Sequence, residues 1–146
     1  MGGGMPIGAF ISSHQNMQAL TNNPMLGHIT TFGGHPVSCA ASKAAFELLY
    51  EEALLTQIPA KEHLFRSLLK HPTIKEIRGK GLLLALQFDS FENTKKIIDT
   101  CIQNGVITDW FLFCDNAMRI APPLTITETQ IKDACAVILN AIETIG

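Results

Sequence analysis

Apolar and polar positions alternate regularly through the second half of the chain, and the period of this alternation changes from segment to segment. A period near 3.6 residues predicts helices, and short apolar, β-branched or aromatic runs predict strands. The order of these segments predicts a compact α/β domain. Its expected elements are a helix over 60–70, two strands within 74–88, a helix over 91–104, strands over 106–113 and 118–121, and a last helix after Thr127.

Capping and turn residues mark the ends of several of these elements. Asp89 and Ser90 are candidate N-caps, and Gly105 is a candidate C′ residue, for the helix that lies between them. Thr127 and Gln130 have the spacing of a capping box before the last helix. An Arg-Gly-Lys-Gly sequence separates the first two strands and predicts a sharp bend or hairpin there.

The first half of the chain has a different pattern. The segment before Pro36 is rich in Gly, Pro, Asn and Met, and only 7–12 resembles a strand. Such a segment buries too little surface to offset its ordering entropy, so we expect it to be disordered or packed in a non-native way. A helix is expected from Pro36, which suits a first helical turn, and Pro59 should stop or bend it. We therefore divide the chain into 1–58, a piece of something larger, and 59–146.

Composition narrows the classes of function. Of the 146 residues 47% are hydrophobic and 16% are charged, which is typical of a globular protein. The net charge of −2 and the lack of a basic stripe argue against nucleic acid as a partner. No apolar run is long enough to cross a membrane, and MGGGMPIGAF is not a signal peptide, so we expect a cytoplasmic protein with no membrane partner. The four cysteines form no CxxC pair, which favours reduced thiols with packing roles over a metal site.

Residues 28–42, HITTFGGHPVSCAAS, place hydroxyls and glycines directly before a predicted helix. A turn that leads into a helix N-terminus explains this pattern. A site for an anion such as phosphate explains it as well, because hydroxyls and exposed backbone N–H groups at a helix start suit phosphate. The stretch by itself leaves both interpretations open.

Three stretches together resemble class III aminotransferases, the pyridoxal-phosphate enzymes that include acetylornithine and ornithine aminotransferases. They are GGGMPIGA at 2–9, TTFGGHP at 30–36 and RIAPPL at 119–124, in the same order and at similar spacing. RGKGLLLAL at 78–86 is also similar to the strand that enters the small domain of this family. The resemblance covers the whole chain.

The resemblance implies the C-terminal part of a fold type I PLP-transferase. Residues 1–58 would form the end of the PLP-binding large domain and a linking helix, and 59–146 the small α/β domain. In the family, GGGMPIGA follows the lysine that forms a Schiff base with the cofactor, so no catalytic residue is expected in this chain and the chain alone should be inactive. The parent protein would be a homodimer that moves an amino group from an ornithine-like or acetylornithine-like amino acid to the 2-oxo acid 2-oxoglutarate.

The resemblance also assigns binding residues. Thr31, with Thr30 beside it, matches the position that reaches the cofactor phosphate across the dimer interface. Arg119 matches the arginine that holds a substrate carboxylate, for which a guanidinium offers two parallel N–H donors. The plain alternatives are a helix cap and a surface ion pair, and we expect Arg78 to be structural. The family usually has Asn in place of His35, and the connection at 108–117 is longer and more aromatic here.

Two other functions are compatible with the residues. The small-residue face at 39–45 suits a stand-alone module that dimerises or binds a partner without chemistry. An aminomutase or decarboxylase would share the fold and the cofactor but not the reaction.

Overall fold

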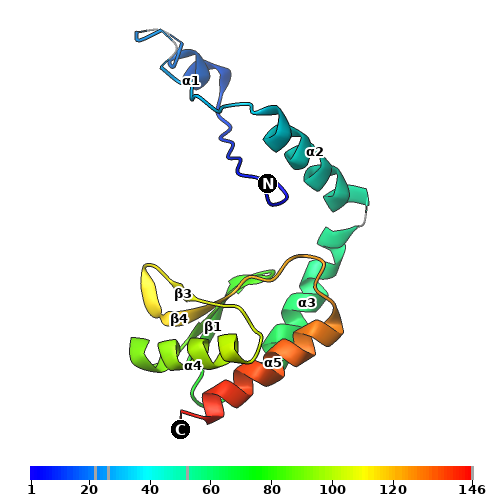
Figure 1. The fold of residues 1–146 in the computed structure, drawn as a ribbon, viewed down its shortest axis with the longest axis vertical. Helices are drawn as coiled ribbons and strands as arrows, with labels where there is room; N and C mark the ends of the chain where they lie inside the picture. The colour runs from blue at the N-terminus through cyan, green and yellow to red at the C-terminus, as the bar shows by residue number, and fades with distance from the viewer. Residues whose placement is uncertain (22, 26, 52, 146) are drawn as a thin grey trace. The chain divides into compact units, whose positions relative to one another are not determined.

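The computed structural model describes residues 1–21, 23–25, 27–51 and 53–145 (Figure 1). The chain separates into two compact units, Met1–Ala53 and Leu54–Gly146. The predicted boundary between 58 and 59 therefore lies inside a helix of the second unit, α3 (Leu54–Leu68). The assignment of the two units to a large and a small domain stays a prediction.

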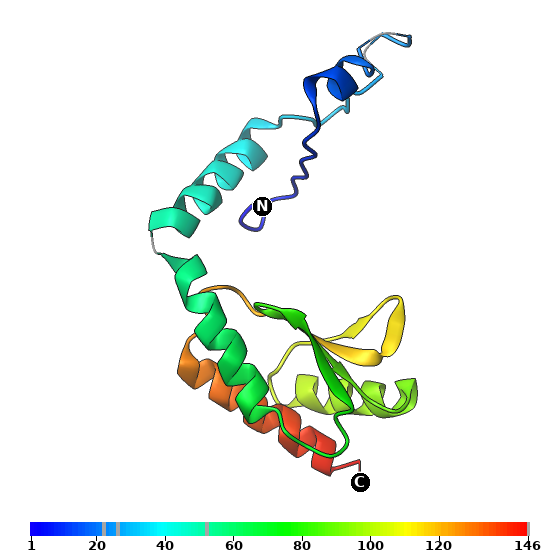
Figure 2. The same ribbon diagram turned by 180° about the vertical axis from the view of Figure 1, so that it is seen from behind.

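The second unit is an α/β fold with a four-stranded antiparallel sheet, in the strand order β1-β2-β4-β3 (Figures 1 and 2). Hairpins join β1 to β2 and β3 to β4, and a helix connects β2 to β3. The helices after α3 are α4 (Phe91–Gln103) and α5 (Glu128–Glu143). The strands are β1 (Glu76–Lys80), β2 (Leu83–Gln87), β3 (Trp110–Phe111) and β4 (Cys114–Ile120).

The core lies between the helices and one face of the sheet. Alternate residues of a strand point to opposite faces, so Leu84, Leu86 and Met118 are fully buried while the positions between them face the other way. Helix α4 packs against β4, and α5 packs against both α3 and α4. The fully buried side chains that complete this core come from the helices and from Leu69, which follows α3; those of the helices are Phe65, Ile97, Ile98, Ile131, Ile138 and Ile142.

The predicted caps of the helices are confirmed. Ser90 is the N-cap of α4, and its Oγ accepts a hydrogen bond from Asn93 N at 3.2 Å. Thr127 and Gln130 form the capping box of α5, with both reciprocal hydrogen bonds present. Gly105 follows α4 with a φ of 87°, a left-handed conformation that favours glycine.

The hairpin between β1 and β2 depends on its glycines and on two side chains of α3. Gly79 has a φ of 121°, and a Cβ on it would lie 2.2 Å from the Leu83 carbonyl oxygen. Arg66 donates hydrogen bonds to the carbonyl oxygens of Ile77 and Gly79, and Glu62 accepts one from Gly81 N at 2.7 Å. The Gly81 hydrogen bond, with help from Arg66, lowers the pKa of Glu62 below its ordinary value of 4.5. The predicted hairpin is thus confirmed, and a helix fixes its position.

The prediction that the helix from Pro36 runs to a stop or bend at Pro59 is wrong, because that helix, α2, ends at Glu51. Pro59 lies inside α3, which begins at Leu54. Pro59 is the sixth residue of α3 and so lies beyond the first four, whose N–H groups have no intrahelical acceptor. Its missing N–H removes one hydrogen bond from the helix. Burial of Leu54 and Phe65 on the same helix favours continuation through the proline.

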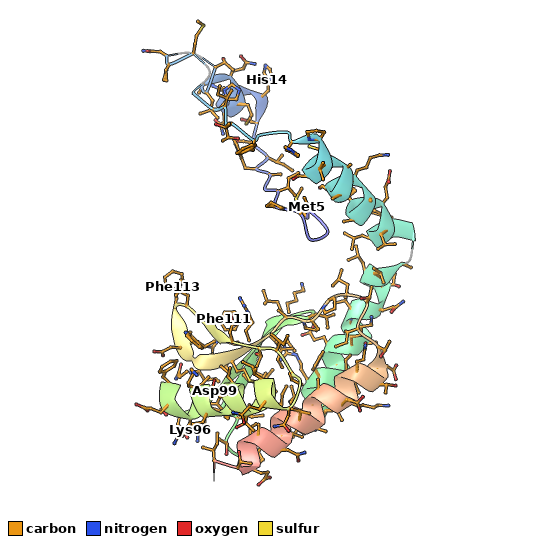
Figure 3. All side chains as sticks on the ribbon, viewed as in Figure 1. Met5, His14, Lys96, Asp99, Phe111 and Phe113 are labelled. Atoms are coloured by element: carbon orange, nitrogen blue, oxygen red, sulfur yellow. The ribbon has the colours of Figure 1, made fainter. Side chains whose placement is uncertain are left out.

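The two predicted strands near the end of the sheet are present with different limits. The predicted strand over 106–113 shrinks to Trp110–Phe111, and the one over 118–121 extends back to Cys114. Phe111 pairs with Cys114, so residues 112 and 113 form a tight turn. The longer connection expected at 108–117 is therefore a β-hairpin, and Phe113 at its tip is 97% exposed (Figure 3).

The first unit contains two helices, α1 (His14–Gln18) and α2 (Pro36–Glu51). The predicted start of α2 at Pro36 is confirmed, whereas the strand predicted at 7–12 is absent from the described residues of this unit. A backbone does approach the small residues of α2: Gly3 has a φ of 53°, and a Cβ on it would lie 3.2 Å from Ala45 Cβ. Of the residues expected to be disordered, 22 and 26 lie outside the described ones.

Cysteine burial differs between the two units. Cys101 and Cys135 are buried in the second unit, and burial raises their pKa to about 11 and about 12. Cys114 is half-buried and Cys39 on α2 is exposed, so the expected packing role holds for two of the four. The described part of the chain contains no cluster of three metal-ligating side chains and no helix long and apolar enough to cross a membrane.

Candidate functional site

The two threonines of the first unit stand at the start of a turn that leads into α2. Gly33 N donates to the Thr30 carbonyl oxygen at 3.1 Å, and His35 N donates to the Phe32 carbonyl oxygen at 3.2 Å. A Cβ on Gly33 would lie 2.7 Å from Thr30 Oγ1, so only glycine fits there without a shift. The sequence Thr-Thr-Phe-Gly-Gly therefore specifies this tight turn, and Thr30 and Thr31 are both exposed on it.

The turn lines a cavity of about 460 Å³ together with Pro6, Ile7 and Gly8. The structure thus brings the first motif, 2–9, to the second motif, 30–36, within one unit. No acidic side chain lines this cavity among the described residues; its other walls are Phe32, Gly33, Gly34, His35 and Ser38. The pair of motifs therefore forms a neutral cavity rich in hydroxyl and backbone groups.

An anion fits the groups that the cavity offers. The hydroxyls of Thr30 and Thr31 have no hydrogen-bond partner among the described residues, so they are available as donors. At the start of α2, Pro36 has no N–H and Cys39 N already donates to the His35 carbonyl oxygen at 2.9 Å, so the N–H groups of Val37 and Ser38 are the ones left at the positive end of the helix dipole. Hydroxyls, free N–H groups and a helix start together suit a phosphate.

Arg119 lies on β4 in the second unit, on the sheet face that points away from the helices. Its cross-strand partner is Ala85 on β2. Two hydrogen bonds fix its backbone: Arg119 N donates to the Asp109 carbonyl oxygen at 2.8 Å, and Thr108 Oγ1 donates to the Arg119 carbonyl oxygen. Pro122 and Pro123 follow directly. Strand pairing and these two bonds therefore position Arg119 without any help from its own side chain.

The guanidinium of Arg119 forms an ion pair with Asp109. Its Nη2 lies 2.7 Å from Asp109 Oδ2, and the two side chains are 44% and 49% exposed. The second carboxylate oxygen, Asp109 Oδ1, is buried without a hydrogen-bond partner among the described residues. An unsatisfied buried acceptor offsets part of the gain from this half-exposed pair.

Arg119 also lines a cavity of about 680 Å³. Leu83, Phe111 and Leu112 supply apolar walls, and the floor is Ala85. A guanidinium beside apolar walls suits a small organic acid, whose carboxylate takes the charge and whose carbon chain takes the walls. The predicted carboxylate-binding residue is thus placed at a cavity of suitable chemistry.

Asp109 was not among the residues that the sequence singled out. The available signal was an acidic residue and an arginine on adjacent arms of one hairpin, ten positions apart. We expected a single strand over 106–113, which obscured that pairing. The unusual segment at 108–117 is therefore where the partner of Arg119 resides.

The chain is similar throughout its length to one family. The Aminotransferase class-III family matches residues 1–142. The chain is 33% identical over 143 residues to an acetylornithine aminotransferase of Haemophilus ducreyi, and 31% identical over 150 residues to one of Caldanaerobacter subterraneus. These matches cover 97% and 99% of the chain but 35% and 36% of the relatives. The chain therefore spans about a third of the length of the curated relatives it matches.

Solved aminotransferases share the fold. An ornithine aminotransferase of Toxoplasma gondii, described with partial occupancy of PLP at its active site, is 32% identical with a TM-score of 0.75 over 88% of this chain and 31% of its own. A thermostable omega transaminase mutant of Pseudomonas jessenii is 25% identical, with a TM-score of 0.76 over 90% of this chain and 31% of its own. These similarities confirm the predicted fold class, a fold type I PLP-transferase fold with a small α/β domain, of which this chain matches about a third.

Proposed function

The chain belongs to the class-III aminotransferase family, and we propose that it forms the C-terminal third of an enzyme that transfers an amino group from an amino acid to a 2-oxo acid. The observation that carries this proposal is the meeting of two family motifs, 2–9 and 30–36, at one cavity without acidic residues among those described. The carboxylate-binding chemistry around Arg119 supports it independently. The resemblance of 2–9 to the family motif supports a cofactor-linking lysine upstream of Gly2 in the proposed enzyme.

The cofactor of this family is pyridoxal 5′-phosphate, and the residues at the first cavity fit its phosphate. We propose that Thr31 donates its hydroxyl to that phosphate, with Thr30 beside it and the first N–H groups of α2 as further donors. When bound, the cofactor supplies an electron sink for the amino acid. The family resemblance makes the phosphate that of a partner subunit, so the proposed enzyme is a homodimer.

Arg119 has the role of substrate anchor in this proposal. Its guanidinium binds one carboxylate of the amino acid or the 2-oxo acid and so orients the reacting end of the molecule. Asp109 occupies the same guanidinium when no substrate is bound and is displaced by the incoming carboxylate. The Asp109→Asn substitution replaces this competing carboxylate with a neutral amide, so it should tighten carboxylate binding by about twofold to fivefold.

The finer assignment follows the curated relatives. We propose ornithine or acetylornithine as the amino donor, 2-oxoglutarate as the acceptor and the cytoplasm as the location. The acetylornithine aminotransferases and the ornithine aminotransferase to which the chain is similar support this choice of donor. The hairpin of β3 and β4 at Arg119 is longer and more aromatic than in the family. The identity of the amino donor therefore most needs a direct test.

The experiment is a transamination assay on the longest natural form of the protein. Ornithine and acetylornithine are offered separately with 2-oxoglutarate, and consumption of 2-oxoglutarate is measured with each. Arg119→Gln should raise the KM for 2-oxoglutarate by about tenfold or more, because a charged bidentate partner is lost. Turnover by the 146-residue chain alone would contradict the absence of a catalytic lysine. Reaction without consumption of 2-oxoglutarate would favour a mutase or decarboxylase.

A further inference from the structure

Lys61 on α3 is the only charged residue that is buried among those the structure describes, and it is 8% exposed. It lies between Leu54 and Phe65 on the inward face of the helix, and both of these residues are buried as well. An ammonium group that is removed from water is unfavourable unless other groups accept its hydrogen bonds. The acceptor that Lys61 has found therefore indicates its role in the fold.

The ammonium of Lys61 is bonded to the main chain of the third motif, 119–124. Its Nζ donates to the Leu124 carbonyl oxygen at 2.7 Å. No carboxylate forms an ion pair with Lys61 among the described residues, in contrast to the exposed pairs of Lys43 and Lys95. A hydrogen bond from a charged donor is stronger than one between neutral groups, so this contact ties α3 to the end of the motif.

The connection between β4 and α5 has little other polar contact with the rest of the unit. In both ribbon views it passes beside α3 (Figures 1 and 2). Of the hydrogen bonds between described residues, the Lys61 contact is the one that joins 121–126 to an element distant in the sequence. This single side chain therefore fixes the main chain of the connection to α3.

Arg119 lies next to that connection. β4 ends at Ile120, so Arg119 is near the end of the paired region, where local opening needs little free energy. The two prolines that follow have no N–H to donate, and each has a fixed φ, which makes the segment stiff. A stiff segment that is held at Leu124 restrains the backbone at its other end, where Arg119 stands.

We propose that Lys61 is a positioning residue for Arg119. Its ammonium holds the Leu124 carbonyl group, the stiff segment carries this restraint to the end of β4, and the guanidinium of Arg119 keeps the direction that a carboxylate needs. The inference rests on the proposed role of Arg119 as the carboxylate anchor. Contacts between a guanidinium and a carboxylate depend on the direction of two N–H donors, so a small displacement of Arg119 weakens them.

The test is the dissociation constant of glutarate, an unreactive analogue of 2-oxoglutarate, measured by calorimetry on the longest natural form of the protein. Lys61→Met keeps an apolar stem of similar length but removes the ammonium, so glutarate should bind about threefold to tenfold more weakly. Lys61→Arg keeps a charged donor and should restore part of the affinity. Unchanged glutarate affinity in Lys61→Met would overturn the proposal.

A matched control on the same helix face separates positioning from stability. Phe65→Leu reduces a fully buried side chain of α3 but leaves the hydrogen bond from Lys61 to Leu124 in place. It should lower the midpoint of thermal unfolding and leave glutarate affinity unchanged. A loss of glutarate affinity in Phe65→Leu that matches its loss of stability would show that Lys61 acts through stability alone, and would overturn the proposal.

Hydrogen exchange measures the restraint at the end of β4 itself. The Arg119 amide donates to the Asp109 carbonyl oxygen at 2.8 Å, so its exchange reports on opening at this point. In Lys61→Met the Arg119 amide should exchange at least about threefold faster, whereas amides of α4 should keep their rates. Equal exchange of the Arg119 amide with and without the ammonium would contradict the restraint.

Arg119→Gln separates this inference from the proposed function. It should weaken glutarate by about tenfold, and Lys61→Met should add little to that loss in the double variant, because it acts through a guanidinium that is already absent. Additive losses would show that Lys61 acts independently of Arg119 and would reject it as a positioning residue.

Two further outcomes decide which proposal fails. Unchanged glutarate affinity in Arg119→Gln, or no glutarate binding by the unmodified protein, would remove Arg119 as the substrate anchor and the role of Lys61 with it. Weaker binding in Arg119→Gln, together with unchanged binding in Lys61→Met, would leave the proposed function standing and reject the role of Lys61 alone.

Discussion

The two units of the chain differ in how far their apolar side chains are buried. In Leu54–Gly146, leucines, isoleucines and phenylalanines from three helices and the sheet form one buried core. Among the described residues of Met1–Ala53, no large apolar side chain is buried, and Phe10, Ile11 and Phe32 are 68%, 96% and 79% exposed. The second unit therefore has a buried apolar core of its own. The first unit exposes apolar side chains, and such surface is typical of a site that contacts other protein.

The same contrast holds for the two candidate sites. Arg119 is placed by strand pairing and by two backbone hydrogen bonds inside a packed unit. Thr31 stands on a turn whose internal hydrogen bonds are local, in a unit with little buried surface. We infer that the proposed carboxylate site is preorganised within the second unit, whereas the proposed phosphate site depends on contacts from outside the first unit.

Thiol labelling should give the largest contrast between the units. Cys39 is exposed, whereas Cys101 and Cys135 are buried and their pKa is raised, so both access and thiolate formation are limited. At pH 8 the two buried thiols should react at least about a thousandfold more slowly than Cys39, because they need opening of the core. Time-resolved labelling with a chromogenic disulfide measures this. Comparable rates for all three thiols would mean that the second unit is not a closed core.

Truncation of apolar side chains to alanine should give the second largest contrast, in the free energy of unfolding. Leu84→Ala removes a fully buried side chain from the central strand β2 and should lower the free energy of unfolding by about 2–5 kcal/mol. Ile11→Ala removes an exposed side chain of the first unit and should change it by no more than about 0.5 kcal/mol. Urea unfolding of the 146-residue chain measures both. A similar loss of unfolding free energy in the two variants would show that the side chain of Ile11 is buried in the folded chain.

Replacement of glycines that have a positive φ compares how tightly the backbone is packed in the two units. Gly79→Ala should destabilise the second unit by about 1–3 kcal/mol, because its φ is 121° and the new Cβ meets the Leu83 carbonyl oxygen. Gly4→Ala also has a positive φ, 98°, but nothing lies within 4 Å of the new Cβ and the surrounding unit is open. Its effect on urea unfolding should be smaller. A larger loss of stability in Gly4→Ala than in Gly79→Ala would contradict the hairpin geometry described for Gly79.

Acid should weaken the second unit through Glu62. The folded state lowers the pKa of Glu62, so this group adds stability above about 4.5 and loses it as the pH falls through the lowered folded value. Glu62→Gln should flatten that part of the stability profile below pH 4.5. Glu47, in an exposed pair with Lys43 on α2, is the matched control, and Glu47→Gln should change stability by no more than about 0.5 kcal/mol. An unchanged dependence of stability on acid pH in Glu62→Gln would contradict a stabilising hydrogen bond from Gly81 to Glu62.

Local signals in the sequence predicted much of the second unit. Ser90, Gly105 and the Thr127 capping box set the limits of two helices, because capping satisfies backbone groups within a few residues. The Arg-Gly-Lys-Gly hairpin was predictable for the same reason. Thr31 and Arg119 came from motif resemblance and not from spacing, and their roles remain predictions.

Features that depend on contacts between residues far apart in the sequence could not be predicted from such local signals. Pro59 continues α3 because burial of the helix offsets one lost hydrogen bond. Segment 7–12 has the apolar side chains of a short strand, but a strand forms only where another pairs with it, and the described part of the first unit contains none. The pairing of Asp109 with Arg119 depends on a hairpin register that the aromatic run of 110–113 concealed.

Hydrogen exchange on the 146-residue chain tests the central claim most directly, namely that the second unit is self-sufficient and the first is not. We predict slow exchange for amides of β2, β4 and α5, and exchange near the unprotected rate for residues before Pro36. Addition of the rest of the enzyme should then protect the turn at Thr31. Strong protection before Pro36 in a monomeric 146-residue chain would contradict the account, because it would show that the first unit already has the packing that we assign to missing partners.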